Sequence, residues 1–173
     1  EGTSHDTMVA CADAIKNIPG TARVSCGFKC ERDLDEMTDA GIQAMAESGT
    51  FSSFKVHARR NHTDFPVNSM EINQIVGGRL SDAYPNVKVQ MKDPDLVVGI
   101  EVVQSATYVY ARSIPGIGGL PVGSSGTVVS LLSSGIDSPV ALWRIARRGA
   151  ICIGVHFSGR PQTSDASEFL VDD

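Results

Sequence analysis

The chain has 173 residues, of which 42% are hydrophobic and 20% are charged, and its net charge at pH 7 is −5. This composition is typical of an ordinary globular protein, and the acidic total excludes a strongly basic nucleic-acid-binding protein. No apolar run reaches the roughly 18–20 residues that a membrane span needs, and the N-terminus lacks the features of a signal peptide. We therefore expect a cytoplasmic protein without a membrane association.

The charges and the cysteines are unevenly placed along the chain. Residues 1–52 hold nine acidic and four basic residues, residues 53–126 hold six and seven, and residues 127–173 hold five and four. Only the middle segment is net positive, so a local basic site is expected there. The cysteines form neither a CxxC pair nor a zinc-finger spacing, and we interpret all four as buried structural thiols: Cys11, Cys26, Cys30 and Cys152.

Residues 1–52 are predicted to form a helix, a strand and a second helix. The segment HDTMVACADAIKNIPG has a short helical pattern that stops at Pro19-Gly20. The alternation in ARVSCGF is that of a half-buried strand, with Val24, Cys26 and Phe28 on one face. Asp33 and Glu36 have the spacing of a capping box at the start of the second helix. One strand cannot form a stable sheet alone, so this segment needs partner strands, which we expect to lie outside the given sequence.

Residues 53–112 are predicted to form an α+β layer with mostly antiparallel connections. In FKVHARR, Lys55, His57 and Arg59 share one face of a strand, and Arg60 and His62 follow at its end. A helix is expected from the N-cap Asn68 onwards, followed by three strands in VKVQM, LVVGIEVV and TYVYAR. The apolar stripe predicted for this helix consists of Ile72, Ile75, Val76 and Leu80.

The last part of the chain begins after a Gly-rich connector at residues 113–126. A buried strand at TVVSLL, a helix over about 138–148 and a second strand at AICIGVHF form a βαβ unit, which implies a parallel sheet. The loop before the helix contains Ser133, Ser134, Gly135, Asp137 and Ser138. Such a loop at a helix N-terminus can bind a phosphate, although a simple helix cap by Asp137 or Ser138 is an equal alternative on composition alone.

The motifs of these segments resemble a known family. SSGIDS is similar to the SGGxDS motif of the PP-loop ATP pyrophosphatases. GIGGLPVGSSG, LLSSGIDSPVALWRIARRG and VHFSGRPQTS resemble, in order and spacing, the tRNA 4-thiouridine synthetase (ThiI) family. FKVHARRNHTDFPVNSMEINQIVGGRL and KDPDLVVGIEV resemble the THUMP domain of that family, and AIKNIPGTARV resembles the end of its ferredoxin-like domain.

The resemblance implies a domain order that covers nearly the whole chain. It consists of a partial ferredoxin-like domain at 1–52, a THUMP domain at 53–112, the connector at 113–126 and the start of an α/β PP-loop domain, of the adenine nucleotide alpha hydrolase type, at 127–173. The family's members extend beyond this chain at both ends, and their sulfur-handling cysteines lie in the later parts. We therefore assign no catalytic cysteine and expect the 173-residue chain alone to be inactive.

The resemblance also implies an activity and site residues. The family adenylates a tRNA uridine with ATP and Mg²⁺, and sulfur from a protein persulfide then gives 4-thiouridine. Asp137 would be the catalytic residue, and no side chains are assigned as a resident metal site. The ATP-binding residues would be Leu131, Leu132, Ser133, Ser134, Gly135, Asp137, Ser138, His156 and Phe157. The RNA-binding residues would be Lys55, His57, Arg59, Arg60 and His62.

Further partners and alternatives accompany this interpretation. The implied partners are tRNA and a cysteine desulfurase, a homodimer is compatible with the family, and a role in thiamine-thiazole synthesis is open. Another PP-loop ATP-dependent RNA-modifying ligase and a pure RNA-binding module without catalysis are the alternative functions. Ser134 stands where the family has Gly, and if that position requires a positive φ, the serine would cost about 1–2 kcal/mol.

Overall fold

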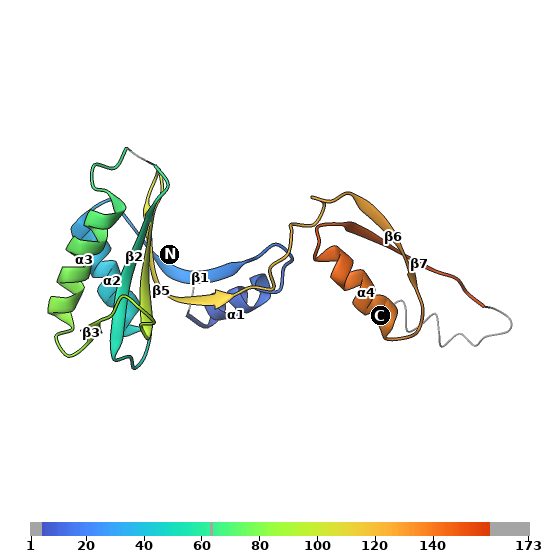
Figure 1. The fold of residues 1–173 in the computed structure, drawn as a ribbon, viewed down its shortest axis with the longest axis horizontal. Helices are drawn as coiled ribbons and strands as arrows, with labels where there is room; N and C mark the ends of the chain where they lie inside the picture. Colours follow the sequence, from blue (N-terminus) through green and yellow to red (C-terminus); the bar gives the residue numbers. More distant parts are fainter. Residues whose placement is uncertain (1–4, 63, 160–173) are drawn as a thin grey trace. The chain divides into compact units, whose positions relative to one another are not determined.

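The computed structural model describes residues 5–62 and 64–159, and the chain divides into two compact units (Figure 1). Unit 1 comprises residues 1–12 and 25–114, and unit 2 comprises residues 13–24 and 115–173. Each unit is therefore built from two separate stretches of the sequence. None of the helices in the described ranges combines the length and apolarity that crossing a membrane requires.

Unit 1 contains a five-stranded sheet with the order β1-β5-β4-β2-β3. Its strands are β1 (Arg23–Cys30), β2 (Ser53–Arg60), β3 (Lys88–Val89), β4 (Leu96–Val102) and β5 (Thr107–Pro115). Strand β2 is parallel to both β3 and β4, whereas β4 is antiparallel to β5. The predicted, mostly antiparallel arrangement is thus wrong around β2. The helix that connects β2 to β3 returns the chain to the end of the sheet at which β2 begins, so the two strands run in the same direction.

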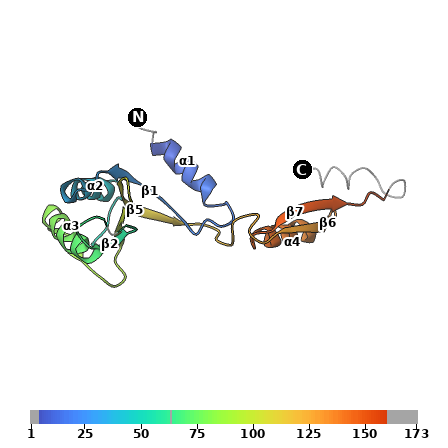
Figure 2. The same cartoon turned by 90° about the horizontal axis from the view of Figure 1, so that it is seen from above.

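Helices α2 (Leu34–Ala46) and α3 (Ser69–Ala83) lie side by side on one face of this sheet (Figures 1 and 2). One buried cluster joins them to the strands, and its fully buried members include Met37, Met45, Phe54, Ile72, Leu80 and Ile100. The boundary predicted between residues 52 and 53 therefore does not separate two cores, because α2 before it and β2 after it share one. Strand β1 also joins the sheet, beside β5, so the prediction that its partner strands lie outside the given sequence is wrong.

Local side-chain contacts explain where the two helices begin. Asn68 accepts hydrogen bonds from the backbone N–H groups of Met70 and Glu71, and the Glu71 carboxylate accepts one from the Asn68 N–H, so the capping box is complete. Asp33 caps α2 in the same way, but Glu36 accepts the N–H of Glu31 instead of that of Asp33. The capping box predicted for α2 is therefore only half formed.

One side chain predicted on the apolar stripe of α3 is partly exposed, and one polar side chain of α3 forms a hydrogen bond with β2. Ile75, predicted on the apolar stripe, is 39% exposed, whereas Ile72, Val76 and Leu80 are fully buried. Strand β3 pairs with only the first two residues of β2, Ser53 and Phe54. The Asn73 side chain accepts the N–H of Ala58 at 2.7 Å, so a polar residue of α3 satisfies one backbone donor further along β2.

Asp95 joins the start of β4 to the start of β2 and should make unit 1 sensitive to acid. Its carboxylate accepts hydrogen bonds from the hydroxyl and N–H of Ser52 and from the N–H of Ser53. These hydrogen bonds lower the pKa of Asp95. The bond from the Ser52 hydroxyl contributes most, and the bond from the Ser52 N–H is next. Because this pKa is lower in the folded state, the stabilisation is present above the unfolded pKa of about 3.9 and is lost as the pH falls through the folded value.

We expect the free energy of unfolding to fall less steeply between about pH 5 and pH 2 in Asp95→Asn than in the parent. Urea denaturation at several pH values would measure this. The exposed carboxylate of Asp82 forms no hydrogen bond or ion pair with the other described residues, so Asp82→Asn serves as the control. Equal acid dependence of the parent and Asp95→Asn would contradict the assignment.

Unit 2 contains the predicted βαβ arrangement. Strands β6 (Thr127–Leu132) and β7 (Ile151–His156) are parallel, with Thr127 opposite Ile151 and Leu132 opposite His156, and α4 (Asp137–Ala146) connects them. The Gly-rich connector packs against the end of α4 through hydrogen bonds from Leu120 N–H to the Arg147 carbonyl and from Ser125 N–H to the Gly149 carbonyl. This strand–helix–strand prediction is confirmed.

The segment after α1 (His5–Ile15) also belongs to unit 2. Its backbone bonds to the start of the connector: Gly20 N–H donates to the Gly118 carbonyl, and Gly116 N–H donates to the Ala22 carbonyl, at 2.9 and 3.0 Å. A side chain at Gly116 would lie 2.1 Å from the Thr21 carbonyl oxygen, so the close approach of the two backbones requires glycine at this position.

The cysteines do not match the prediction of buried thiols. Cys11 and Cys26 are exposed, and Cys30 and Cys152 are half-buried; all four are free. Burial and the nearby carboxylates, with Glu36 the largest contributor among them, raise the pKa of Cys30 to about 11. This thiol is therefore protonated at neutral pH and is a poor nucleophile.

Candidate functional site

The loop between β6 and α4 lies beyond the carboxyl ends of two parallel strands. Leu132 and His156 are register partners at the ends of β6 and β7, and Ser133 begins the loop. Ligands of parallel sheets bind at this edge because connecting loops and helix N-termini meet there. The structure therefore brings together Leu131, Leu132, Ser133, Ser134, Gly135, Asp137, Ser138 and His156, with Phe157 next along the chain.

Two serine side chains shape this loop. The Ser138 hydroxyl accepts the N–H of Ser133 at 2.9 Å and lies 3.0 Å from the Ser133 carbonyl oxygen. The Ser133 hydroxyl is 3.1 Å from that of Ser138 and accepts the N–H of Gly135 at 3.3 Å. These bonds fold the loop back against the first turn of α4.

The N-terminus of α4 lacks the side-chain cap that α2 and α3 possess. Its N-cap residue is Ile136, and no side-chain hydrogen bond caps the helix in this described segment. Asp137 is the first helical residue, and Ser138 bonds backwards into the loop, so the alternative that either residue is merely the N-cap is excluded. The N–H groups of Asp137 and Ser138 and the helix dipole are thus left without a side-chain cap, an arrangement that can bind an anion.

Ser134 adopts its place in the loop without backbone strain. Among the described residues, Asp93 is the only non-glycine residue with a positive φ. The cost considered for serine in place of glycine at position 134 therefore does not arise. Gly135 also has no positive φ, and a Cβ added there would meet only the Ser133 hydroxyl oxygen, at 3.5 Å. Neither residue is required by the fold of the loop itself.

The residues expected to contact the adenosine differ in exposure. Leu131 is 64% exposed and Phe157 is 75% exposed, whereas Leu132 and His156 are half-buried. The Nδ1 atom of His156 lies 2.9 Å from the Leu132 carbonyl oxygen, which fixes the ring against β6. The exposed apolar side chains and the uncapped helix lie at the same end of the βαβ unit, an arrangement suited to a ligand with both an apolar ring and phosphates.

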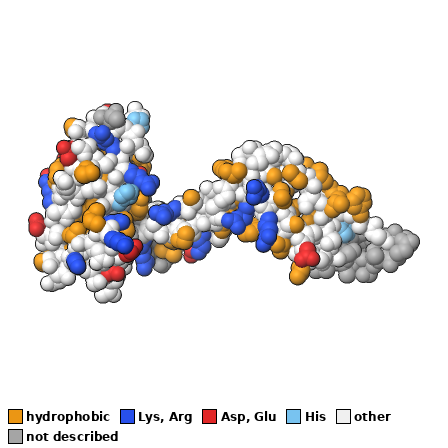
Figure 3. Space-filling model, viewed as in Figure 1, with side chains coloured by type: hydrophobic (Ala, Val, Ile, Leu, Met, Phe, Trp, Pro, Cys, Tyr) orange, Lys and Arg blue, Asp and Glu red, His pale blue; other side chains and the backbone are white. Residues whose placement is uncertain are grey.

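A second candidate site is the face of the unit 1 sheet opposite α2 and α3. Lys55, His57 and Arg59 alternate on this face of β2, with Val56 and Ala58 buried on the other. The Lys55 ammonium donates to the Met91 carbonyl at 3.3 Å, and Arg59 donates to the His57 ring at 3.2 Å. Figure 3 shows Lys and Arg side chains along the side of unit 1 on which the sheet, rather than the helices, lies.

The neighbouring strands contribute residues that the sequence interpretation did not single out. The register places Arg59 opposite Glu101, and Glu101 opposite Tyr108. Tyr108 is 43% exposed, and Arg112, further along β5, is also exposed. Period-two alternation in TYVYAR identifies both as facing away from Val109, but only the strand register shows that they share a face with Arg59.

Arg60 and His62 occupy different surroundings from these three residues. Arg60 alternates onto the opposite face of β2 and donates to the Phe65 carbonyl at 2.6 Å and to the Val67 carbonyl at 3.2 Å. It therefore secures the loop that follows β2. His62 is exposed in that loop, beyond the end of the strand. The structure thus separates Arg60 from the basic face of β2, which is formed by the half-buried Lys55 and the exposed His57 and Arg59.

Comparisons with known proteins match both of the segments that carry these two candidate sites. The family model "THUMP domain" matches residues 31–112, and the model "Thiamine biosynthesis protein (ThiI)" matches residues 123–172. A "Probable tRNA sulfurtransferase" of Natranaerobius thermophilus is 38% identical over 98% of this chain and 43% of its own length. One of Clostridium acetobutylicum is 38% identical over 93% of this chain and 41% of its own length. The chain thus spans less than half the length of these relatives.

Two solved structures share the fold. The crystal structure of a 4-thiouridine synthetase–RNA complex with bound ATP has a TM-score of 0.76 and 32% identity, over 99% of this chain and 44% of that chain. The structure of PH1313 from Pyrococcus horikoshii has a TM-score of 0.81 and 27% identity, over 95% of this chain and 56% of that chain.

The sheet with two helices on one face, together with the family-model match, defines a THUMP-domain protein. The βαβ unit that follows matches the beginning of the ThiI domain. The chain belongs to the ThiI family of tRNA sulfurtransferases, and it comprises the THUMP domain and the start of the ThiI domain.

Proposed function

We propose that this chain is the tRNA-binding and ATP-binding part of a tRNA uridine 4-sulfurtransferase. The observation that carries the proposal is the uncapped N-terminus of α4 behind a Ser–Gly loop, in the same chain as a THUMP domain. An anion site and an RNA-binding module are the two parts that ATP-dependent modification of tRNA requires. The names of the relatives, and the RNA and ATP bound in the solved 4-thiouridine synthetase complex, support this assignment.

The proposed domain order follows the structure and the family matches. Residues 31–112 form the THUMP domain, residues 113–126 the connector, and residues 127–173 the start of a PP-loop domain of the adenine nucleotide alpha hydrolase type. We propose that α1 and β1 are the end of a ferredoxin-like domain. A cysteine desulfurase as sulfur donor, a homodimer, a cytoplasmic location and a role in thiamine synthesis belong to the same proposal.

In the proposed reaction, the uridine O4 atom attacks the α-phosphorus of ATP and pyrophosphate leaves. The outer sulfur of a protein persulfide then attacks C4, and AMP leaves with the former O4 oxygen. A second thiol attacks the remaining S–S bond, so that a disulfide forms and 4-thiouridine is released. The chain's own role is to bind charge and to hold the reactants in position. Ser133, Gly135, Ser138 and the N–H groups at the start of α4 would hold the phosphates, and Leu131, Leu132, His156 and Phe157 would surround the adenosine.

Asp137 would act beside the phosphates through Mg²⁺. Its carboxylate is exposed in the first turn of α4, next to the proposed phosphate site. Among the described residues, no three His, Cys, Asp or Glu side chains converge as a metal site. Proteins commonly bind Mg²⁺ through one or two carboxylates together with substrate phosphates and water.

The RNA-binding part of the proposal predicts a salt-dependent loss of affinity on removal of two basic side chains of the β2 face, the half-buried Lys55 and the exposed Arg59. We expect Lys55→Ala combined with Arg59→Ala to weaken binding of unmodified tRNA and to flatten the plot of log K against log salt by about two units, at about 0.9 per phosphate contact. Filter binding at several salt concentrations measures both quantities. Arg60 is left intact because its replacement would release the loop after β2.

The matched control removes two other exposed bases of unit 1, Lys88 and Lys92, by replacement with alanine. It makes the same change in net charge without altering β2, since Lys88 lies on β3 opposite Ser53 and Lys92 lies in the loop after β3, and a smaller effect on the salt dependence is expected. If both double variants reduced the slope equally, the effect would be one of net charge and the β2 face would not be the RNA site. If the parent bound no tRNA, the proposed function would be wrong.

The ATP-binding part predicts that Gly135→Ala weakens ATP binding without disturbing the fold. The added methyl group meets no atom closer than 3.5 Å in the structure, but in this proposal it would narrow the space left for the phosphates. A steric conflict of about 1–3 kcal/mol corresponds to about a 5- to 150-fold higher Kd. Calorimetric titration of the full-length protein with ATP tests this.

Gly78→Ala is the control for that experiment. Gly78 lies in α3 with no atom within 4 Å of an added Cβ, so alanine there should stabilise the helix by about 0.5–1 kcal/mol. ATP affinity should not change. Unaltered ATP affinity in Gly135→Ala would contradict the proposal that this loop binds the phosphates.

A further inference from the structure

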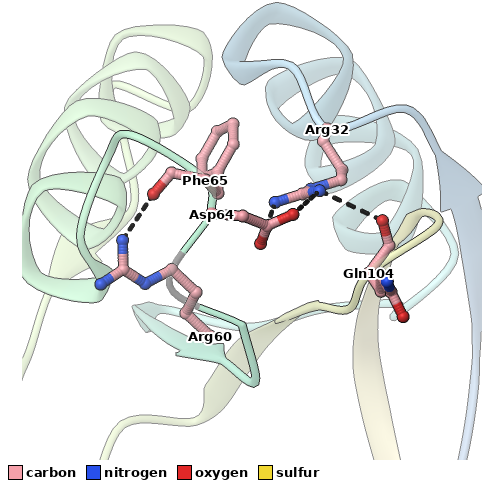
Figure 4. Close-up of polar contacts among 5 residues, drawn as sticks. All are labelled: Arg32, Arg60, Asp64, Phe65 and Gln104. Carbon is pink, nitrogen blue, oxygen red and sulfur yellow. Dashed lines mark hydrogen bonds and ion pairs between the residues drawn. The ribbon is translucent and has the colours of Figure 1, made fainter.

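Arg32 joins three loops at one end of the unit 1 sheet. Its guanidinium makes a bidentate pair with the Asp64 carboxylate, at 2.7 and 2.8 Å, and donates to the Gln104 carbonyl at 3.1 Å (Figure 4). Arg32 precedes α2, Asp64 follows β2, and Gln104 lies between β4 and β5. The guanidinium also lies 5.5 Å from the centre of the Phe65 ring. One side chain therefore ties the loop after β2 to two other loops.

A second arginine holds the same loop from the strand side. Arg60 donates to the carbonyls of Phe65 and Val67, and Figure 4 shows its side chain on the opposite side of Phe65 from Arg32. The N–H of Asn61 donates to the Val102 carbonyl at the end of β4. The β2–α3 loop, taken here as Asn61, His62 and residues 64–67, is thus fixed at its start, at its acidic residue and at its end.

The Arg32–Asp64 pair is poorly explained by stability alone. The Arg32 and Asp64 side chains are 21% and 53% exposed, and exposed ion pairs contribute little to folding because water and salt screen them. The hydrogen bond between the two side chains lowers the pKa of Asp64 and raises that of Arg32, so both groups are charged at neutral pH. Their geometry is directional, however, and a bidentate pair fixes the orientation of the backbone that carries it.

The loop connects directly to the proposed RNA-binding face. Arg59 is the last exposed basic residue of β2, and His62 follows three residues later within the held loop. We propose that Arg32 and Asp64 are positioning residues, which orient the β2–α3 loop so that His62 and Arg59 contact the same stretch of RNA backbone. This inference rests on the proposed function, because it concerns how the chain presents its RNA-binding residues.

The change in tRNA affinity caused by Asp64→Asn distinguishes a positioning role of Asp64 from a purely electrostatic one, because the two roles predict changes of opposite sign. If Asp64 acted only through its charge, removing an acidic group beside an RNA-binding face would strengthen tRNA binding. If Asp64 positions the loop, the isosteric amide breaks the bidentate pair and binding weakens several-fold although the protein becomes less acidic. The slope of log K against log salt should flatten by about one unit, because one phosphate contact is lost.

The test measures tRNA affinity of the full-length protein by filter binding over a range of salt, with thermal unfolding of each variant in parallel. Asp39→Asn is the matched control, since Asp39 is an exposed carboxylate of α2 that forms no hydrogen bond or ion pair with the other described residues. Its affinity should be equal to or slightly above that of the parent. Arg32→Ala should reproduce the loss seen in Asp64→Asn, and Arg32→Lys should restore only part of it, because lysine cannot form the bidentate pair.

The outcomes distinguish this inference from the proposed function. Weaker binding and a flatter salt slope in Asp64→Asn, with an unfolding temperature close to that of the parent, support the inference. Equal or tighter binding by Asp64→Asn, while the parent binds tRNA, overturns the inference and leaves the proposed function intact. Should Arg32→Ala unfold, Asp64→Asn and Arg32→Lys still decide the question. Absence of tRNA binding by the parent overturns both.

Discussion

Replacement of Asp137 by Asn should weaken Mg²⁺-dependent ATP binding by about 10- to 100-fold, the range found when groups that support a metal ligand are removed. The carboxylate is exposed in the first turn of α4, and neither Ser133, Gly135 nor Ser138 can replace its charge. Asn keeps the shape of the side chain, so the variant isolates the effect of the charge. Titration with ATP in Mg²⁺ and in EDTA measures the expected result: the parent binds more tightly with Mg²⁺, and the variant shows little difference.

Folding should change little in this variant. An acidic residue in the first helical turn contributes about 0.3–1 kcal/mol through the helix dipole. Asp35→Asn is the control: it removes an acidic residue from the first turn of α2 together with an exposed ion pair to Arg79, so a similarly small loss of stability and unchanged ATP binding are expected. Parent-like Mg²⁺ dependence in Asp137→Asn would mean that this carboxylate does not approach the metal-bound phosphates.

The second large effect concerns the core of unit 1. Phe54 is fully buried on β2, in the strand that lies between β3 and β4. Phe54→Ala should reduce the free energy of unfolding by about 3–5 kcal/mol, because the lost burial is compounded by the cavity that remains. Such a loss is a large part of the total of about 5–15 kcal/mol for a typical domain. Urea denaturation followed by circular dichroism measures it.

Met70→Ala provides the comparison within the same unit. Met70 is 68% exposed on α3, so its truncation should change the free energy of unfolding by less than about 0.5 kcal/mol. Equal losses in the two variants would show that β2 does not form the centre of the core.

The sequence predicted the local elements well because their signals are local. Asn68 and Glu71 mark the start of α3 through contacts within one turn, and the apolar runs at 127–132 and 151–156 identify β6 and β7. The parallel pairing of β6 and β7 followed from the single helix between them. The Ser–Gly loop was identified for the same reason, since its residues are consecutive.

The errors arose where distant segments meet. No local pattern shows that β1 joins β5 or that α2 shares the core of β2, so the boundary at residue 52 was placed within one unit. Arg60 resembles Arg59 in sequence, and only the carbonyls of Phe65 and Val67 reveal its different role. Likewise, the cysteines were expected to be buried from their residue type, but exposure depends on which elements cover each strand.

The pairing of residues 16–22 with residues 116–118 has a consequence for synthesis on the ribosome. Lys16, Gly20 and Ala22 are translated almost 100 residues before the connector to which they bond. At about 5–20 residues per second, this early segment stays without its partners for several seconds. During that interval β1 to β5 are completed, so unit 1 can fold before unit 2 has both of its parts. A released chain that ends near residue 114 should therefore protect β2 and β4 from proteases while the segment around Gly20 is still cleavable.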